Sequence, residues 1–496
     1  MIAKVQGASF DGLMPIEVTV EVSARKGLPG FDIVGMGQTE VKEGKQRITT
    51  ALLQAGIALK NKKITVNLAP ASVRKSGAYL DLPIAVAVMQ LVGLLDFQRM
   101  SDFLCFGELS LDGGVRPVKG GFALVESLRK DQTTVIFPGE NVDVYHCGSN
   151  HKFIPITHIQ DVIKYFENPQ TAPVDIKHPS SFESVVSHID FARIRGQHAA
   201  KRMLTIAATG RHHVMLAGPP GIGKTLLAKA FPSILPQLTS EERRDVLKIY
   251  SASGLEINNV SCEPPIRLPH HHASLPGMIG GGVKFQAGDF MLSHRGVLFM
   301  DEFPEFRRDV IEALREPLEE GMVRVRRAQG LFEYPAKFQL IAAMNLCPCG
   351  NMGDQNKECE CTEAQVQKYK RKLSKPITDR LDLCMILPKI SWQEVWEGTN
   401  EVSSKDIQKE VTKARIAQYE RWGMGKTNAD ATLDELKKNG CISQDALILV
   451  EKIVKQKNMS VRSVVKTLRV ARSIADVDGQ NDVETSSVLE AFQYRM

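Results

Sequence analysis

The chain has 496 residues, of which 43% are hydrophobic, and its formal net charge is +6. A chain of this length and apolar content is globular and too long for one core, so we expect two to four domains. The longest apolar run, residues 84–95, is too short to cross a bilayer, and nine cysteines without a signal peptide argue against a disulfide framework, so we expect a soluble cytoplasmic protein with no membrane partner.

Residues 1–167 alternate β-rich and helical patterns, which is typical of an independent α/β domain. The β-rich runs are residues 16–22, 64–68 and 134–137, and the apolar helical stretches are 42–55 and 82–94. A polar stretch containing prolines follows at 168–187. We expect this stretch to be a linker to the rest of the chain.

The remaining residues divide into a sheet-containing core and a helical region. In residues 188–390, helices alternate with short apolar strands, which predicts a parallel sheet covered on both faces and hence the α/β class. From 391 to 496 the strand and glycine signals fade. Amphipathic helices are predicted there at 405–422, 443–457 and 461–474, and together they predict a helical lid.

A glycine-rich segment directly follows the apolar run 214–217 and precedes an apolar helical stretch. Its eight residues are Gly218, Pro219, Pro220, Gly221, Ile222, Gly223, Lys224 and Thr225. Glycines let backbone N–H groups surround phosphates, the lysine reaches the β and γ oxygens, and the threonine hydroxyl ligates Mg²⁺. The segment therefore predicts a nucleoside triphosphate site at the carboxyl ends of the strands, with an ordinary glycine-rich turn as the alternative.

Two later strands end in polar residues that suit the same site. The apolar run 297–300 ends in Asp301 and Glu302, of which the first would hold the Mg²⁺ shell and the second would orient and polarise the attacking water. The run 338–344 ends in Asn345, whose amide could hydrogen-bond the γ-phosphate or the water. The alternatives are an ordinary strand end and a turn-forming asparagine.

Four cysteines crowd into the loop 346–362 that follows this asparagine. They form two Cys-x-Cys pairs: Cys347, Cys349, Cys359 and Cys361. Four soft ligands suit tetrahedral Zn²⁺, although the spacing is tighter than the usual Cys-x2-Cys, and four reduced thiols are the alternative. Three consecutive histidines at 270–272 do not easily face one ion, so we expect them to serve a loop rather than a metal.

The order of these motifs resembles the AAA+ ATPases, and more closely their magnesium-chelatase-like branch that contains the ComM/YifB family. The resemblance covers essentially the whole chain, and its carriers are residues 190–197, 296–302, 343–350, 377–382 and 460–476. It implies ATP as the nucleotide. It also implies a homo-oligomeric ring, usually a hexamer.

The resemblance assigns further residues to the site. Ile194, Gly196 and Gln197 would border the adenine, and Asn345 would be the sensor 1 residue. Arg380 would be an arginine finger that reaches a neighbouring subunit, and Arg462 would be sensor 2 in the lid. Alternatively, Arg380 could pair with a flanking carboxylate, and Arg462 could be a plain surface arginine of a helix.

Basic and glycine-rich segments suggest what such a motor acts on. A glycine-rich insert at 275–285 and a predicted hairpin at 323–334, with Arg324, Arg326 and Arg327, resemble loops that line the channel of related rings. A basic run adds Lys368, Lys370, Arg371, Lys372 and Lys375. Such cations could follow a phosphate backbone, but they could also be a solvated face or meet acids of a neighbour.

The resemblance implies a branch-migration helicase that acts on single-stranded or branched DNA in natural transformation, with recombination proteins as possible partners. The alternative is a protein-remodelling motor, either a magnesium-chelatase-type subunit or a Lon-like unfoldase.

The segments 69–85 and 113–121 resemble the Lon protease domain. The positions that match the Ser-Lys dyad of Lon fall at 82–85 and 120–123, which hold neither a serine nor a lysine. We therefore expect a domain kept for assembly or substrate handling rather than proteolysis. A dyad built from Ser72 with Lys75 or Lys119 is the alternative.

Overall fold

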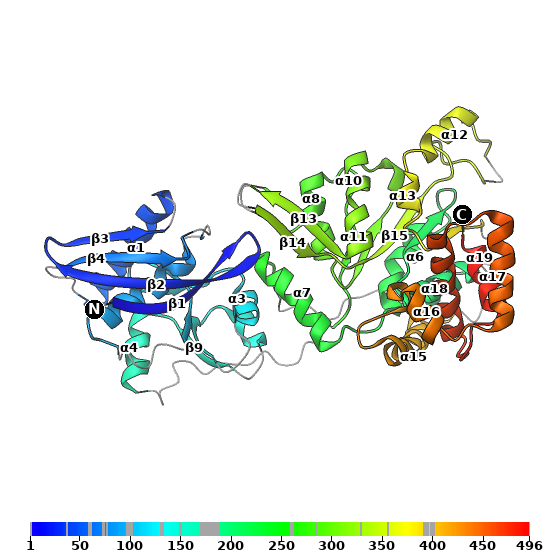
Figure 1. Ribbon diagram of the computed structural model, residues 1–496. Helices are drawn as coiled ribbons and strands as arrows, with labels where there is room; N and C mark the ends of the chain where they lie inside the picture. The colour runs from blue at the N-terminus through cyan, green and yellow to red at the C-terminus, as the bar shows by residue number, and fades with distance from the viewer. Residues whose placement is uncertain are drawn as a thin grey trace. The chain divides into compact units, whose positions relative to one another are not determined.

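Figure 1 shows the fold of the protein as a computed structural model. It describes residues 2–35, 38–57, 62–71, 75, 78–95, 103–128, 133–147, 151–168, 189–257, 262–282, 285–327, 330–354, 357–389, 396 and 402–495. Apart from Asn168, the predicted linker at 168–187 lies outside the described residues.

The residue contacts divide the chain into two compact units that do not follow chain order. The first comprises residues 1–184, 244–261 and 282–287, and the second comprises 185–243, 262–281 and 288–496. Helix α7 (Ser240–Ala252) begins in the second unit, while most of its length belongs to the first.

The first unit is built on a seven-stranded mixed sheet in the order β3-β4-β2-β1-β5-β8-β9. Its strands are β1 (Ile2–Asp11), β2 (Met14–Lys26), β3 (Gly30–Val34), β4 (Lys62–Ala69), β5 (Phe103–Cys105), β8 (Thr134–Pro138) and β9 (Lys152–Ile156). Its helices are α1 (Gln38–Gln54), α2 (Asp81–Leu91), α3 (Gly121–Leu128) and α4 (Ile159–Glu167), and a short ribbon joins β6 (Glu108–Leu109) to β7 (Val115–Arg116). The apolar faces of these elements meet in two buried clusters.

Part of the first unit comes from the segment 244–261. Leu247 and Ile257 of this segment pack into a cluster with Phe10 and Phe122. The hydroxyl of Ser251 accepts a hydrogen bond from the backbone N–H of residue 123 and donates to Asp143. This buried polar contact fixes the segment within the first unit.

The second unit is built on a five-stranded sheet in the order β11-β12-β15-β10-β16, and every pairing in it is parallel. The strands are β11 (Ile266–Arg267), β12 (Val297–Met300), β15 (Gln339–Met344), β10 (Val214–Ala217) and β16 (Leu383–Ile386). Strands β10, β12 and β15 are buried at every residue, which explains why all their residues but Gln339 are apolar.

The second unit also contains helices and one hairpin. The helices are α5 (His198–Gly210), α6 (Lys224–Ala230), α8 (Leu275–Ile279), α9 (Asp289–Leu292), α10 (Arg308–Ala313), α11 (Arg315–Glu320), α12 (Glu363–Lys370) and α13 (Lys375–Thr378). The predicted hairpin forms from β13 (Met322–Arg327) and β14 (Gly330–Pro335). The first part of the glycine-rich insert at 275–285 folds as α8, because Ser274 caps it and a proline occupies its first turn.

The carboxyl-terminal part is helical, as predicted. Its helices are α15 (Ser404–Trp422), α16 (Leu433–Asn439), α17 (Gln444–Lys457), α18 (Val461–Val477) and α19 (Thr485–Gln493). Their apolar residues join the sheet and α5 in one continuous buried cluster. Buried Arg415 of α15 donates to the carbonyl oxygens of residues 208 and 209 at the end of α5, which ties the lid to the core.

Candidate nucleotide site

The glycine-rich segment lies at the carboxyl end of strand β10, which runs between β15 and β16. Its backbone turns at positive φ angles, 149° at Gly218, 80° at Gly221 and 95° at Gly223, before α6 begins. An added Cβ at position 218 would lie 2.4 Å from the Cδ1 atom of Ile222 and 3.2 Å from the carbonyl oxygen of Leu387, so the Ile222 side chain would have to move. The loop therefore sits where proteins with open parallel sheets bind ligands.

The side chain of Lys224 crosses this loop. Its Nζ donates to the carbonyl oxygens of Gly218 at 2.6 Å and Pro219 at 2.8 Å, and to Oδ1 of Asn345 at 3.1 Å. Burial lowers the pKa of this lysine, while the charge of Asp301 acts in the opposite direction. The lysine and the asparagine that follows β15 therefore belong to one site, although they are far apart in the sequence.

Thr225 and the end of strand β12 complete the site. The Thr225 hydroxyl donates to Oδ2 of Asp301 at 2.6 Å, and Oδ1 of this aspartate accepts from the backbone N–H of Glu302 at 2.9 Å. A hydroxyl oxygen and a carboxylate in contact are the hard oxygen ligands that Mg²⁺ prefers. The residues present thus fit a magnesium-bound triphosphate.

The backbone of Glu302 adopts a left-handed conformation with φ 52°. Its Oε2 atom lies 3.1 Å from Nδ1 of His271. This histidine is a site residue that our sequence analysis missed, because nothing in a histidine triplet indicates which strand end it will face. The ligand atoms of all three histidines lie within 4.8 Å of one another, and their rings pack on each other.

The segment expected to border the adenine lies against the phosphate loop. Ile194 is buried, and Gly196 and Gln197 have positive φ angles of 62° and 54°. The Gln197 side-chain amide donates to the carbonyl oxygens of Ile222 at 3.3 Å and Pro388 at 2.9 Å. Its buried Oε1 atom has no hydrogen-bond partner among the described residues, which leaves an acceptor beside the loop.

Arg380 and Arg462 meet at a single carboxylate instead of joining the phosphate loop. Nη2 of Arg380 contacts one oxygen of Glu319, and Nη2 of Arg462 lies 3.2 Å from the other. Nη1 of Arg380 also donates to the carbonyl oxygen of Pro376. The carboxylate partner is therefore neither of the flanking aspartates that the sequence offered.

Glu319, Arg380 and Arg462 line a cavity of about 650 Å³ in the second unit. Residues at the amino ends of four strands also line it: His213, Gly296, Gln339 and Asp382. The cavity therefore lies where the parallel strands begin, which we call the amino edge of the sheet. The phosphate loop follows the carboxyl end of β10 and so lies where the strands end, at the carboxyl edge. Strands of four to six residues are about 13–20 Å long, so the arginine pair and the phosphate loop of one chain lie on opposite edges.

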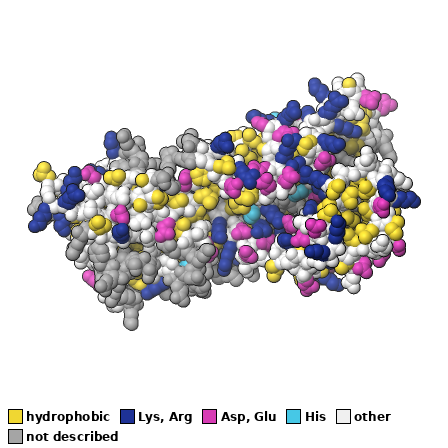
Figure 2. All heavy atoms as spheres, viewed as in Figure 1, with side chains coloured by type: hydrophobic (Ala, Val, Ile, Leu, Met, Phe, Trp, Pro, Cys, Tyr) yellow, Lys and Arg dark blue, Asp and Glu magenta, His cyan; other side chains and the backbone are white. Residues whose placement is uncertain are grey.

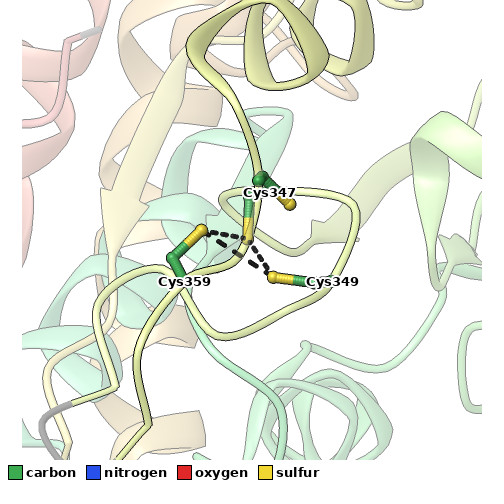
Figure 3. A group of neighbouring side chains, drawn as sticks. Cys347, Cys349 and Cys359 are labelled. Carbon is green, nitrogen blue, oxygen red and sulfur yellow. Dashed lines mark hydrogen bonds between the residues drawn. The ribbon is translucent and has the colours of Figure 1, made fainter.

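Cys347, Cys349 and Cys359 converge in space (Figure 3), and Cys361 belongs to the same group. The Sγ atom of Cys347 lies 3.4 Å from that of Cys349 and 3.6 Å from that of Cys359, the latter two are 3.7 Å apart, and all four sulfur atoms, including that of Cys361, fall within 4.8 Å. Thiolates around one tetrahedral Zn²⁺ are about 3.8 Å apart. The backbone N–H of Met352 also donates to Cys347, a contact that suits a metal-bound thiolate.

The predicted basic surfaces are partly neutralised. Arg324 of the hairpin forms ion pairs with three carboxylates: Glu316 at 2.8 Å, Glu320 at 2.6 Å and Glu333 at 2.7 Å. Arg326 is exposed on the same face of β13. In the basic run, Lys372 pairs with Glu305, and Figure 2 shows Lys and Arg side chains gathered over α12.

The Lon-like segments form buried elements of the first unit. Residues 82–85 are buried in α2, and 121–123 are buried in α3. Lys75 is buried and donates to the carbonyl oxygen of Pro70. Its proposed dyad partner Ser72 lies outside the described residues.

Three sequence profiles of one protein family match the chain. "Magnesium chelatase, subunit ChlI" matches residues 190–395, "Subunit ChlI of Mg-chelatase" matches 20–141, and "Magnesium chelatase, subunit ChlI C-terminal" matches 401–495. The competence protein ComM of Haemophilus influenzae is 34% identical over 502 residues, which cover 100% of this chain and 97% of that protein. The chain belongs to the magnesium chelatase ChlI-like family, within its ComM/YifB group.

Two further relatives support the same assignment. The uncharacterized protein YifB of Escherichia coli is 35% identical to this chain, and the match covers 96% of this chain and 94% of YifB. An archaeal Lon protease of Halobacterium salinarum is 39% identical over 75 residues, which are 15% of the chain. The predicted resemblance and the α/β fold class are thus confirmed.

The family consists of magnesium-chelatase-type AAA ATPases, which implies ATP hydrolysis with Mg²⁺, and its members typically form oligomers. Among the described residues, no helix has both the length and the apolar character needed to cross a membrane.

Proposed function

We propose that this protein is a ring-forming, ATP-driven DNA motor, a branch-migration helicase that aids recombination of incoming DNA in natural transformation. The observation that carries the DNA role is the similarity along its full length to a protein named for competence. The phosphate loop with its strand-end carboxylates supports the motor role.

In this proposal the residues at the carboxyl edge of the sheet bind and activate ATP. Backbone N–H groups of residues 218–223 and the Lys224 ammonium hold the phosphates, and Thr225 and Asp301 would hold Mg²⁺, which neutralises charge that develops on the phosphates. Glu302 orients and polarises the attacking water, and Asn345 aligns the lysine and the γ-phosphate. Ile194, Gly196 and Gln197 border the adenine.

Hydrolysis then depends on a second subunit. An arginine that neutralises the developing charge is worth roughly 10³- to 10⁵-fold in rate. Because Arg380 and Arg462 lie at the amino edge of the sheet, we infer that both act on the nucleotide of a neighbour, Arg380 as the finger and Arg462 as sensor 2. An arrangement in which each subunit completes the site of the next forms a closed ring when the rotation between subunits closes, and we propose a ring of six subunits.

The cysteine loop is the proposed zinc site. Its four sulfur atoms have the chemistry and spacing of a closed structural site. The first unit, which offers no Ser-Lys dyad at the positions that match Lon, would serve assembly or substrate handling.

The proposal is tested by the ATPase rate with and without single-stranded, duplex and four-way-junction DNA. We expect stimulation by single-stranded or branched DNA, because a motor couples hydrolysis to movement on its track. Stimulation by none of these DNAs would contradict the DNA role. That result would favour a protein-remodelling motor, which the ChlI profiles also allow.

A further inference from the structure

The cysteine loop lies directly against the phosphate loop. Gly350 approaches Pro220 so closely that an added Cβ would lie 3.3 Å from its Cδ atom and 3.8 Å from Nδ2 of Asn345. An added Cβ at Gly353 would lie 3.8 Å from Cδ of Pro219. Both glycines have positive φ angles, of 83° and 86°, which other residues rarely adopt. The backbone between the two cysteine pairs is therefore shaped to cover the phosphate-loop prolines.

The same loop is anchored on two further sides. It begins after Asn345, whose Oδ1 atom accepts from Lys224. Asp354 forms an ion pair of 2.8 Å with Lys389, the residue after Pro388, and the carbonyl oxygen of Pro388 accepts from Gln197. The loop thus contacts the phosphate-binding part of the site directly, and residues 388–389 link it to Gln197 of the adenine-bordering part.

Side chains rather than regular structure hold this loop in shape. Among the described residues between β15 and α12 there is no helix or strand, and the four sulfur atoms join the two ends of the segment. Closing a loop of this kind without a cross-link costs conformational entropy, which a bound metal offsets by joining the ends.

We propose that zinc bound by Cys347, Cys349, Cys359 and Cys361 braces the phosphate loop, so that metal occupancy sets the affinity for nucleotide. The inference rests on the proposed nucleotide and zinc sites and adds a coupling between them. Because such coupling is reciprocal, bound nucleotide strengthens zinc retention by the same factor.

The test uses the full-length protein and the variant Cys359→Ser/Cys361→Ser. This variant removes the second cysteine pair, which is farther in sequence from the phosphate loop than the first pair. Cys441→Ser, at an exposed cysteine of the lid, is the matched control. Zinc is measured by elemental analysis, ADP affinity by calorimetry, and folding by circular dichroism. We expect wild type and control to hold one zinc per chain, and the double variant to hold none and to bind ADP about ten times more weakly.

A second variant keeps all four ligands. Gly350→Ala strains the contact with Pro220, so we expect it to retain zinc, to bind ADP more weakly, and to lose the ability of ADP to slow zinc transfer to a chelator. This variant distinguishes the brace from a general loss of folding.

Each contrary result has a separate meaning. Unchanged ADP affinity in the folded, zinc-free double variant overturns the brace while leaving the nucleotide site intact. Wild-type protein that contains no zinc overturns the proposed zinc site and the brace with it. Wild-type protein that binds zinc but no nucleotide overturns the proposed nucleotide site, and the coupling with it.

Discussion

Individual side chains at the nucleotide site are positioned by partners from other segments. Lys224 is held by Asn345, the residue after β15, and Thr225 is held by Asp301, the residue after β12. Glu302, the residue proposed to activate water, likewise contacts a residue from another segment, His271. We infer that this histidine orients the carboxylate and is a positioning residue.

His271→Ala tests this role. We expect ATP turnover to fall about tenfold, because a misplaced carboxylate aligns water poorly, while ADP affinity stays at the wild-type level. His272→Ala, at the exposed neighbour, should leave both values unchanged. Equal loss of ADP affinity and turnover in His271→Ala would instead indicate a structural role in the loop.

Among the elements, the β13–β14 hairpin divides its arginines between two tasks. Three carboxylates neutralise Arg324, two of them from α11, so this arginine fixes the hairpin to the core. The neighbouring Glu319 of α11 holds Arg380 and Arg462. Helix α11 thus contacts both the proposed subunit interface and the proposed DNA-binding hairpin.

Arg326 is the arginine of the hairpin that we expect to meet a DNA phosphate. Arg326→Ala should weaken binding of single-stranded DNA. It should also reduce the slope of log affinity against log salt concentration by about 1, the change expected for the loss of one phosphate contact. Fluorescence anisotropy across a salt series measures both, with Arg308→Ala, at an exposed arginine of α10, as the control. An unchanged slope would assign Arg326 to the solvated surface.

Local patterns predicted most of these elements, and packing explains the rest. The phosphate loop, the ends of β12 and β15, and helices such as α15 are encoded by contiguous residues, so their sequence sufficed. The role of Glu319 could not be predicted, because it lies 61 residues from Arg380 and only the folded sheet brings them together. The contact of Gly350 with Pro220, and the membership of residues 244–261 in the first unit, were hidden for the same reason.

At the scale of the whole molecule, the sheet separates the two halves of the proposed catalytic machinery. The phosphate loop follows its carboxyl edge, and the arginine pair lies in the cavity at its amino edge. On the proposed assignment, a single chain holds one half of each of two sites. We therefore expect ATP hydrolysis only in the assembled protein.

Mixing two inactive variants tests this claim most directly. Lys224→Ala subunits lack a working phosphate loop, and Arg380→Ala subunits lack the finger but should still bind ATP, so each alone should be inactive. In oligomers mixed at equal amounts, and confirmed as mixed by mass photometry, about a quarter of the interfaces unite an intact loop with an intact finger. We expect about that fraction of the wild-type ATPase rate, whereas mixed oligomers that stay inactive, or Arg380→Ala subunits that turn over ATP alone, would contradict the account.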